Sequence, residues 1–207
     1  MNSSLLKRGL VVALVLAGLC LCVFYGVSQM KSAAKKADLL ERMENLHYEA
    51  RGIGFNNPDM LARLTDGIGE CSEMLEENPN DEKMRRTLTG LYVDRCQLHA
   101  RLGKLPEALS DIEKVIDSYK LMKDSAYGAA CEYRASLLRK SNRWQDAMDA
   151  YKQLIAEGKE SHHTYRALIA MTKNAPNVAD RDLKAIEEYR RKGIAMVGND
   201  WQERDDD

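Results

Sequence analysis

A segment that recurs along the chain without a gap limits the possible folds more than any other feature. Residues 102–118 read LGKLPEALSDIEKVIDS, and residues 141–157 read SNRWQDAMDAYKQLIAE. The corresponding residues are Leu105 and Trp144, Ala108 and Ala147, and Ile112 and Tyr151. Side chains three and four positions apart share one face of a helix. Each alanine therefore marks a place where a second helix can approach closely between two larger side chains.

The spacing of these alanines indicates a repeated structural unit. Ala108 and Ala147 are 39 residues apart, and a weaker third copy in residues 180–197 places Ala185 a further 38 residues along. This third copy has Asp182 where the first two have a bulky residue. A chance alanine in an ordinary amphipathic helix is the alternative for any single copy. Recurrence at roughly 20–50 residues is typical of stacked supersecondary units, so the repeat is the better interpretation.

A second helix is predicted before each copy of the segment. Residues 88–103 and 124–142 carry apolar and small residues at steps of three and four, with charged residues between them. Gly103 and Asn142 then stand where the chain must turn, and both residue types tolerate a positive φ. Each unit is therefore predicted to be a helix, a tight turn and a second helix.

This pattern resembles the tetratricopeptide repeat family. The resemblance covers residues 89–158 most clearly and extends to about residue 198. The residues that carry it are Tyr92, Cys96, Gly103 and Ala108 in one unit, and Ala135, Trp144, Ala147 and Tyr151 in the next. The spacing exceeds the usual period of about 34 residues, and the third unit has an apparent insertion at residues 172–182. The resemblance implies an α-solenoid of helix-turn-helix units that binds a protein or peptide.

The rest of the chain outside the first thirty residues also reads as helix. Residues 57–81 place apolar side chains at helical steps, with Asn57 as a possible cap and Pro58 suited to the first turn. Residues 31–52 place Leu39, Met43, Leu46 and Ala50 at heptad-like steps. Because no segment alternates with a period of two over the length of a strand, we predict an all-α fold.

The N-terminal region contains one uncharged apolar segment, residues 9–30, between Arg8 and Lys31. As a helix it would reach roughly 33 Å, enough for the hydrocarbon core of a bilayer. We predict a single transmembrane helix that contacts the lipid bilayer, with cleavage near residues 32–34 as the alternative. A short tail before the span favours a bacterial inner-membrane protein whose C-terminal domain lies outside the cytoplasm.

These predictions divide the chain into five regions. They are a tail at residues 1–8, a transmembrane helix at 9–30, a helical linker at 31–56, a repeat domain at 57–198 and an acidic tail at 199–207.

Three cysteines of the repeat domain, Cys71, Cys96 and Cys131, fall on apolar helix faces. Three thiols cannot all pair within one chain, so we expect them to be buried and unpaired.

Composition and motifs argue against most chemical functions. The chain has 31 basic and 32 acidic residues and no basic stripe with interleaved aromatics, so no nucleic-acid partner is expected. His47 and His99 lack a Cys or acidic residue at ligand spacing, and the adjacent His162 and His163 would point about 100° apart on a helix. No phosphate-binding loop, dinucleotide turn or nucleophile elbow occurs. We therefore expect no metal, no cofactor, no small-molecule substrate and no enzymatic activity.

The remaining expectation is a partner-binding groove. By resemblance, the residues that face it are Val93, Gln97, Ala100, Glu132, Ser136 and Arg139. Some members of the family clamp a terminal carboxylate with Lys and Asn at these places, but this chain has no such set. We expect reversal of the charges at Glu132 and Arg139 to weaken partner capture without changing stability. The expected function is a membrane-anchored scaffold for protein interaction, and the alternative is a permanent structural or assembly subunit of a membrane protein complex.

Overall fold

The described part of the chain consists of α-helices, one short 3-10 helix and no strand. The computed structural model describes the backbone of residues 3–52, 59–175 and 182–201, and the side chains of these ranges from residue 24 onward except residue 199. The α-helices are α1 (Ser3–Gly52), α2 (Met60–Glu77), α3 (Glu82–Arg101), α4 (Leu105–Met122), α5 (Tyr127–Lys140), α6 (Trp144–Ala156), α7 (His162–Lys173) and α8 (Leu183–Val197). The 3-10 helix η3 (Gly198–Asp200) follows α8. The predicted all-α class is confirmed for this part.

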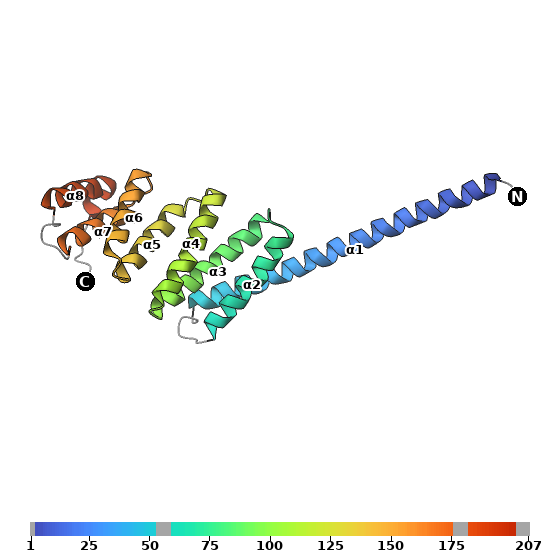
Figure 1. Ribbon diagram of the computed structural model, residues 1–207, viewed down its shortest axis with the longest axis horizontal. Coiled ribbons are helices and arrows are strands. Elements are labelled where there is room, and N and C mark those ends of the chain that lie inside the picture. The colour runs from blue at the N-terminus through green and yellow to red at the C-terminus, as the bar shows by residue number, and fades with distance from the viewer. Residues whose placement is uncertain (1–2, 53–58, 176–181, 202–207) are drawn as a thin grey trace.

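The helices follow one another across the domain as a row of antiparallel hairpins (Figure 1). Residues 102–104 join α3 to α4, and residues 141–143 join α5 to α6. The connection from α7 to α8 is longer, as the insertion at residues 172–182 predicts, and residues 176–181 of it lie outside the described residues. This arrangement is consistent with an α-solenoid.

The two short connections have the same turn geometry. Gly103 has a φ of 72° and Asn142 a φ of 57°, both in the left-handed region. The next amide in each turn reaches back to the helix, from Lys104 N to His99 O at 2.9 Å and from Arg143 N to Leu138 O at 3.0 Å. These bonds satisfy carbonyls that the helix end would leave without partners. The prediction of a turn at Gly103 and Asn142 is confirmed.

The repeated alanines lie in the core. Ala108, Ala135 and Ala147 are 0% exposed. Ala147 packs with Leu154 and Leu168 in a cluster that joins α5, α6 and α7. The small side chains are therefore enclosed where neighbouring helices pack together, as the sequence predicts.

The match is weaker at two positions of the repeat. Trp144 and Leu105 are only half-buried, because each is the first residue of its helix and solvent reaches one side of it. In the third copy, Ala185 is half-buried and its neighbour Ile186 is buried instead. The third unit therefore repeats the spacing without enclosing its alanine.

Enlarging the buried alanines tests this packing. Ala108→Leu and Ala147→Leu should each lower the free energy of unfolding by about 1–3 kcal/mol, because the added carbons have no space between the helices. Ala156→Leu is the matched control, since Ala156 is an exposed residue of α6. Urea unfolding followed by circular dichroism measures the effect. Equal midpoints for the buried and exposed variants would contradict the close packing.

Among the described side chains of α1, those buried against the domain belong to its C-terminal part. Leu39, Met43, Leu46 and Ala50 are all buried, in one cluster with α2 and α3, as their heptad-like spacing predicts. The described residues before Leu39 are exposed apart from two that are half-buried. In Figure 1 this outer part of α1 projects away from the rest of the fold. One continuous helix covers residues 3–52, so the expected tail, membrane span and linker share a single element.

The predicted membrane span lies mostly outside the described side chains. Residues 9–23 of the span belong to the part of α1 whose side chains are not described. Among the described residues, no helix is apolar over a length that would cross a bilayer. The described end of the span carries exposed apolar side chains, with Phe24, Tyr25 and Met30 being 76%, 67% and 66% exposed.

The three described cysteines are unpaired, as predicted. Cys71 and Cys96 are buried, whereas Cys131 is half-buried. Burial raises the pKa of the Cys71 thiol to about 11 and that of Cys96 to about 12. Because the thiolate is the reactive form, these two side chains act as small core residues.

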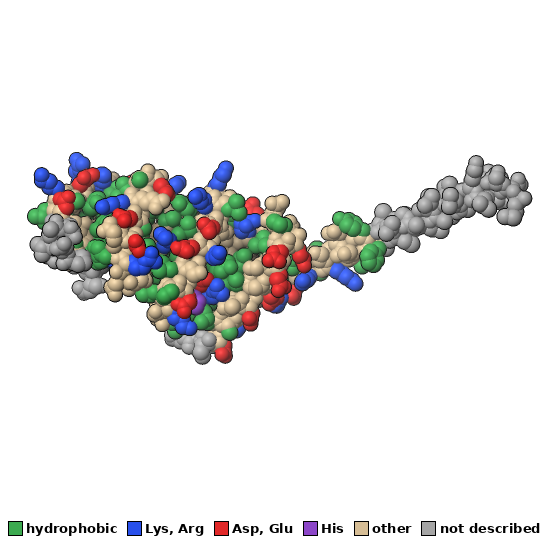
Figure 2. All heavy atoms as spheres, viewed as in Figure 1, with side chains coloured by type: hydrophobic (Ala, Val, Ile, Leu, Met, Phe, Trp, Pro, Cys, Tyr) green, Lys and Arg blue, Asp and Glu red, His purple; other side chains and the backbone are tan. Residues whose placement is uncertain are grey.

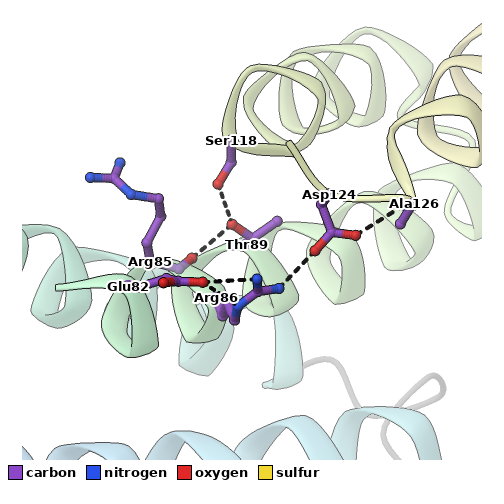
Figure 3. A network of polar contacts seen from close by, with 7 residues as sticks. All are labelled: Glu82, Arg85, Arg86, Thr89, Ser118, Asp124 and Ala126. Carbon is purple, nitrogen blue, oxygen red and sulfur yellow. Dashed lines mark hydrogen bonds and ion pairs between the residues drawn. The ribbon is translucent and has the colours of Figure 1, made fainter. Parts of the chain in front are cut away.

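Polar contacts also join the hairpins. The guanidinium of Arg86 lies between Glu82 and Asp124, at 2.9 and 2.7 Å, as Figure 3 shows. Asp124 in turn accepts a hydrogen bond from Ala126 N, at 2.9 Å. This network connects α3 to the turn between α4 and α5.

Candidate partner-binding site

Three of the six expected groove residues lie around one hollow. Glu132, Ser136 and Arg139 of α5 line a hollow of about 390 Å³ between α5 and α7. The α7 side contributes His163 and Arg166. Helices α5 and α7 are the first helices of adjacent hairpins, so the hollow lies where two repeat units meet. Its size falls within the usual range for ligand pockets, which begins at about 300 Å³.

The other three expected residues lie elsewhere. Val93, Gln97 and Ala100 are half-buried on α3. Val93 and Ala100 pack against the apolar cluster that includes Ala108 and Leu137. Val93 and Ala100 therefore contribute to packing between helices, and none of the three residues lines the α5–α7 hollow.

Glu132 supports the fold as well as lining the hollow. Its Oε1 accepts hydrogen bonds from Ser161 Oγ at 2.7 Å, from Ser161 N at 3.3 Å and from the hydroxyl of Thr164. Ser161 is the N-cap of α7, where a carboxylate is favoured by the helix dipole. Reversing the charge at Glu132 would remove these bonds. We therefore expect this change to lower the stability of the fold, whereas the sequence predicted no effect.

Within the part of the chain that the structure describes, neither arginine of the hollow has a carboxylate partner. Among the described residues, no hydrogen bond or ion pair involves the side chain of Arg139 or Arg166. The Nε of Arg166 is buried and unbonded. Its guanidinium stacks 5.3 Å from the centroid of a Trp201 ring.

The arginines of the other described hollows are all paired. Arg134, which lines a hollow of about 290 Å³ between α4, α5 and α6, lies 3.4 Å from Glu113. A hollow of about 330 Å³ between α1 and α3 contains Arg86, held by Glu82 and Asp124. In the hollow between α1 and α2, Arg42 and Arg63 each bind a glutamate at 2.6 Å. The α5–α7 hollow therefore differs from these three because its arginines have no ion-pair partner among the described residues.

Neighbouring titratable groups respond to this environment. The pKa of His162 is lowered, first by burial and then by the positive charges of His163 and Arg166. Burial raises the pKa of Tyr133, which also lines the hollow, so its phenol stays protonated and can donate a hydrogen bond.

Sequence reasoning missed Arg166, His163 and Trp201. The first two could have been found by treating residues 162–173 as the first helix of the third unit and placing it beside α5. Trp201 gives no such signal, because it comes after the last repeat. It reaches Arg166 only when the chain after α8 folds back across the hairpin.

The fold defines a class, a stack of α-helical hairpins with one long N-terminal helix. Comparison with models of known families, with curated proteins and with solved structures gives no match to the chain. Within the described part of the chain, no three metal-ligating side chains converge on one point. The site is therefore characterised by its own geometry.

Proposed function

We propose that this chain is a tetratricopeptide-like scaffold, anchored in a membrane by α1, that holds a protein or peptide partner near the bilayer. The observation that carries the proposal is the α5–α7 hollow, with two arginines that lack a carboxylate partner among the described residues. Stacked hairpins hold such residues in place before binding, so little ordering is needed when a partner arrives.

The outer part of α1 supports the anchoring step. Its exposed apolar side chains at Phe24, Tyr25 and Met30 are followed by Lys31 and Lys35. In Figure 2 the apolar groups of this segment stand away from the domain, beside basic ones. Aromatic and basic residues of this kind are common where a helix leaves a bilayer. Residues 31–38 would separate the bilayer from the packed helices by up to roughly 12 Å.

Anchoring would strengthen capture through effective concentration. A groove confined to a thin layer beside the membrane meets a membrane-associated partner far more often than a free domain does. Removal of residues 1–30 leaves the described contacts between α1 and the domain in place. The first residue of α1 that forms an ion pair with the domain is Lys36, and the first buried residue is Leu39. Anchor and groove can therefore be tested separately.

We expect partner capture to require both features. In native membranes, Arg139→Glu and the variant lacking residues 1–30 should each give a lower crosslinking yield than the unmodified chain. Arg139→Glu should keep the melting temperature of the unmodified chain, because Arg139 forms no described ion pair that could be lost. The shortened variant should keep it as well, because the buried residues of α1 begin at Leu39. Lys152→Glu is the control, as Lys152 is exposed on α6 and is not one of the residues that line the hollow. Alkaline carbonate extraction measures anchoring independently.

One result would favour the alternative function. Equal crosslinking yields from all variants would show that neither the hollow nor the anchor holds the partner. A permanent subunit of a membrane complex, packed through another face, would then be the better explanation.

A further inference from the structure

The lining of the α5–α7 hollow contains two arginines and one carboxylate, that of Glu132, so a net positive charge remains. The carboxylate of Glu132 is committed to the N-terminus of α7 through Ser161 and Thr164. Arg139 and Arg166 reach the same hollow from opposite helices. An arginine guanidinium forms paired hydrogen bonds with a carboxylate, and these are stronger than bonds between neutral groups.

We propose that this hollow binds an acidic segment of a partner protein, whose Asp or Glu side chains pair with Arg139 and Arg166. The inference rests on the proposed function and names the chemistry of the partner. Ser136 and the phenol of Tyr133 also line the hollow and supply hydroxyl groups for hydrogen bonds to the same segment. Side-chain carboxylates of the partner are sufficient for this recognition, so its C-terminal carboxylate is not needed.

Trp201 is a positioning residue for Arg166. The indole ring lies against the guanidinium and limits where this long side chain can point. The ring itself is seated on Gly193 of α8, where a methyl group would overlap it. A residue beyond the repeats therefore holds one of the two binding arginines in place.

Binding of a defined peptide tests the recognition step. The probe is a fluorescein-labelled peptide of alternating Asp and Glu with an amidated C-terminus, added to the full-length chain in detergent. Arg139→Gln and Arg166→Gln should each weaken binding about tenfold, the loss expected for a charge-assisted pair. Binding should also weaken as salt is raised. Arg134→Gln, on α5 but outside this hollow, should bind as the unmodified chain does.

The role of Trp201 is tested by a pair of variants. Trp201→Ala and Gly193→Ala should weaken peptide binding to a similar extent, and Trp201→Phe should restore most of it. Gly193→Ala should have no further effect in the Trp201→Ala background, because both changes remove the same contact. If the losses of peptide affinity from the two changes were additive, the positioning role of Trp201 would be overturned. Independent structural effects of the two residues would add in this way.

Four outcomes would overturn the assignment. One is an affinity for the acidic peptide that neither arginine variant changes, and another is equal binding of a control peptide of alternating Asn and Gln. Residues 202–207 include Glu203 and three aspartates. If the chain bound the peptide only after their removal, its own acidic end would be the occupant. If the peptide did not bind but crosslinking still depended on Arg139 and the anchor, this partner chemistry would be rejected. The proposed function would then remain intact.

Discussion

Asp111→Ala is expected to lower the free energy of unfolding by about 3–5 kcal/mol, the usual cost of breaking a buried ion pair by removing one partner. Asp111 is buried on α4 and accepts two hydrogen bonds from Arg95 of α3, from Nη2 at 2.7 Å and from Nε at 3.0 Å. His99 Nε2 lies 3.8 Å from the same carboxylate. Removing the carboxylate leaves a guanidinium inside the α3–α4 hairpin with little access to water.

Two further variants separate this effect from the loss of side-chain volume. Asp117→Ala removes the same atoms from an exposed position of α4 and should change stability by less than about 0.5 kcal/mol. Replacing both partners together, as Arg95→Met with Asp111→Leu, should recover much of the loss, because no buried charge is then left alone. Urea unfolding of the four proteins gives the comparison. If Asp111→Ala were as stable as the double variant, this result would contradict a buried ion pair between Arg95 and Asp111.

His47→Ala is expected to cost about 3 kcal/mol, although His47 itself is only half-buried. Its Nδ1 pairs with Asp94, whose side chain is 0% exposed. The other partner of Asp94 is Arg51 Nε, at 3.4 Å. Without the imidazole, the carboxylate would keep only this longer contact. The change also removes a link between α1 and α3, so α1 should be cleaved more readily by protease.

The neighbouring residue provides the control for this prediction. Tyr48→Ala should have little effect on stability, because Tyr48 is an exposed residue of the same helix. Urea midpoints and limited proteolysis measure the two variants under the same conditions. Equal losses for His47→Ala and Tyr48→Ala would show that the pair with Asp94 does not contribute.

The deficit of His47→Ala should depend on pH. Burial raises the pKa of Asp94, and the positive charges of His47 and Arg51 oppose this shift. A carboxyl whose pKa is raised on folding favours the folded state below its unfolded pKa, near 3.9, and loses this contribution as pH rises through its folded pKa. Loss of His47 raises the folded pKa further. The difference in stability from the unmodified chain should therefore shrink as pH is lowered toward 4.

Local periodicity was enough to predict the helices and their buried faces. Ala108 and Ala147 lie in the core, and Leu39, Met43 and Leu46 face the domain, because a helix brings residues three and four apart onto one side whatever surrounds it. The turns at Gly103 and Asn142 were also predictable, since a positive φ is a property of the residue and its immediate neighbours.

The contacts that characterise the site depend on the tertiary structure alone. Glu132 was expected to serve only a partner, but stacking of α5 on α7 brings it to the cap at Ser161. Arg166 meets Trp201 because the chain after α8 returns across the last hairpin. Residue spacing determined which side chains share a helix face, because that geometry is local. Only the packing of one hairpin on the next decided which charges were paired and which were left free, because those partners are far apart along the chain.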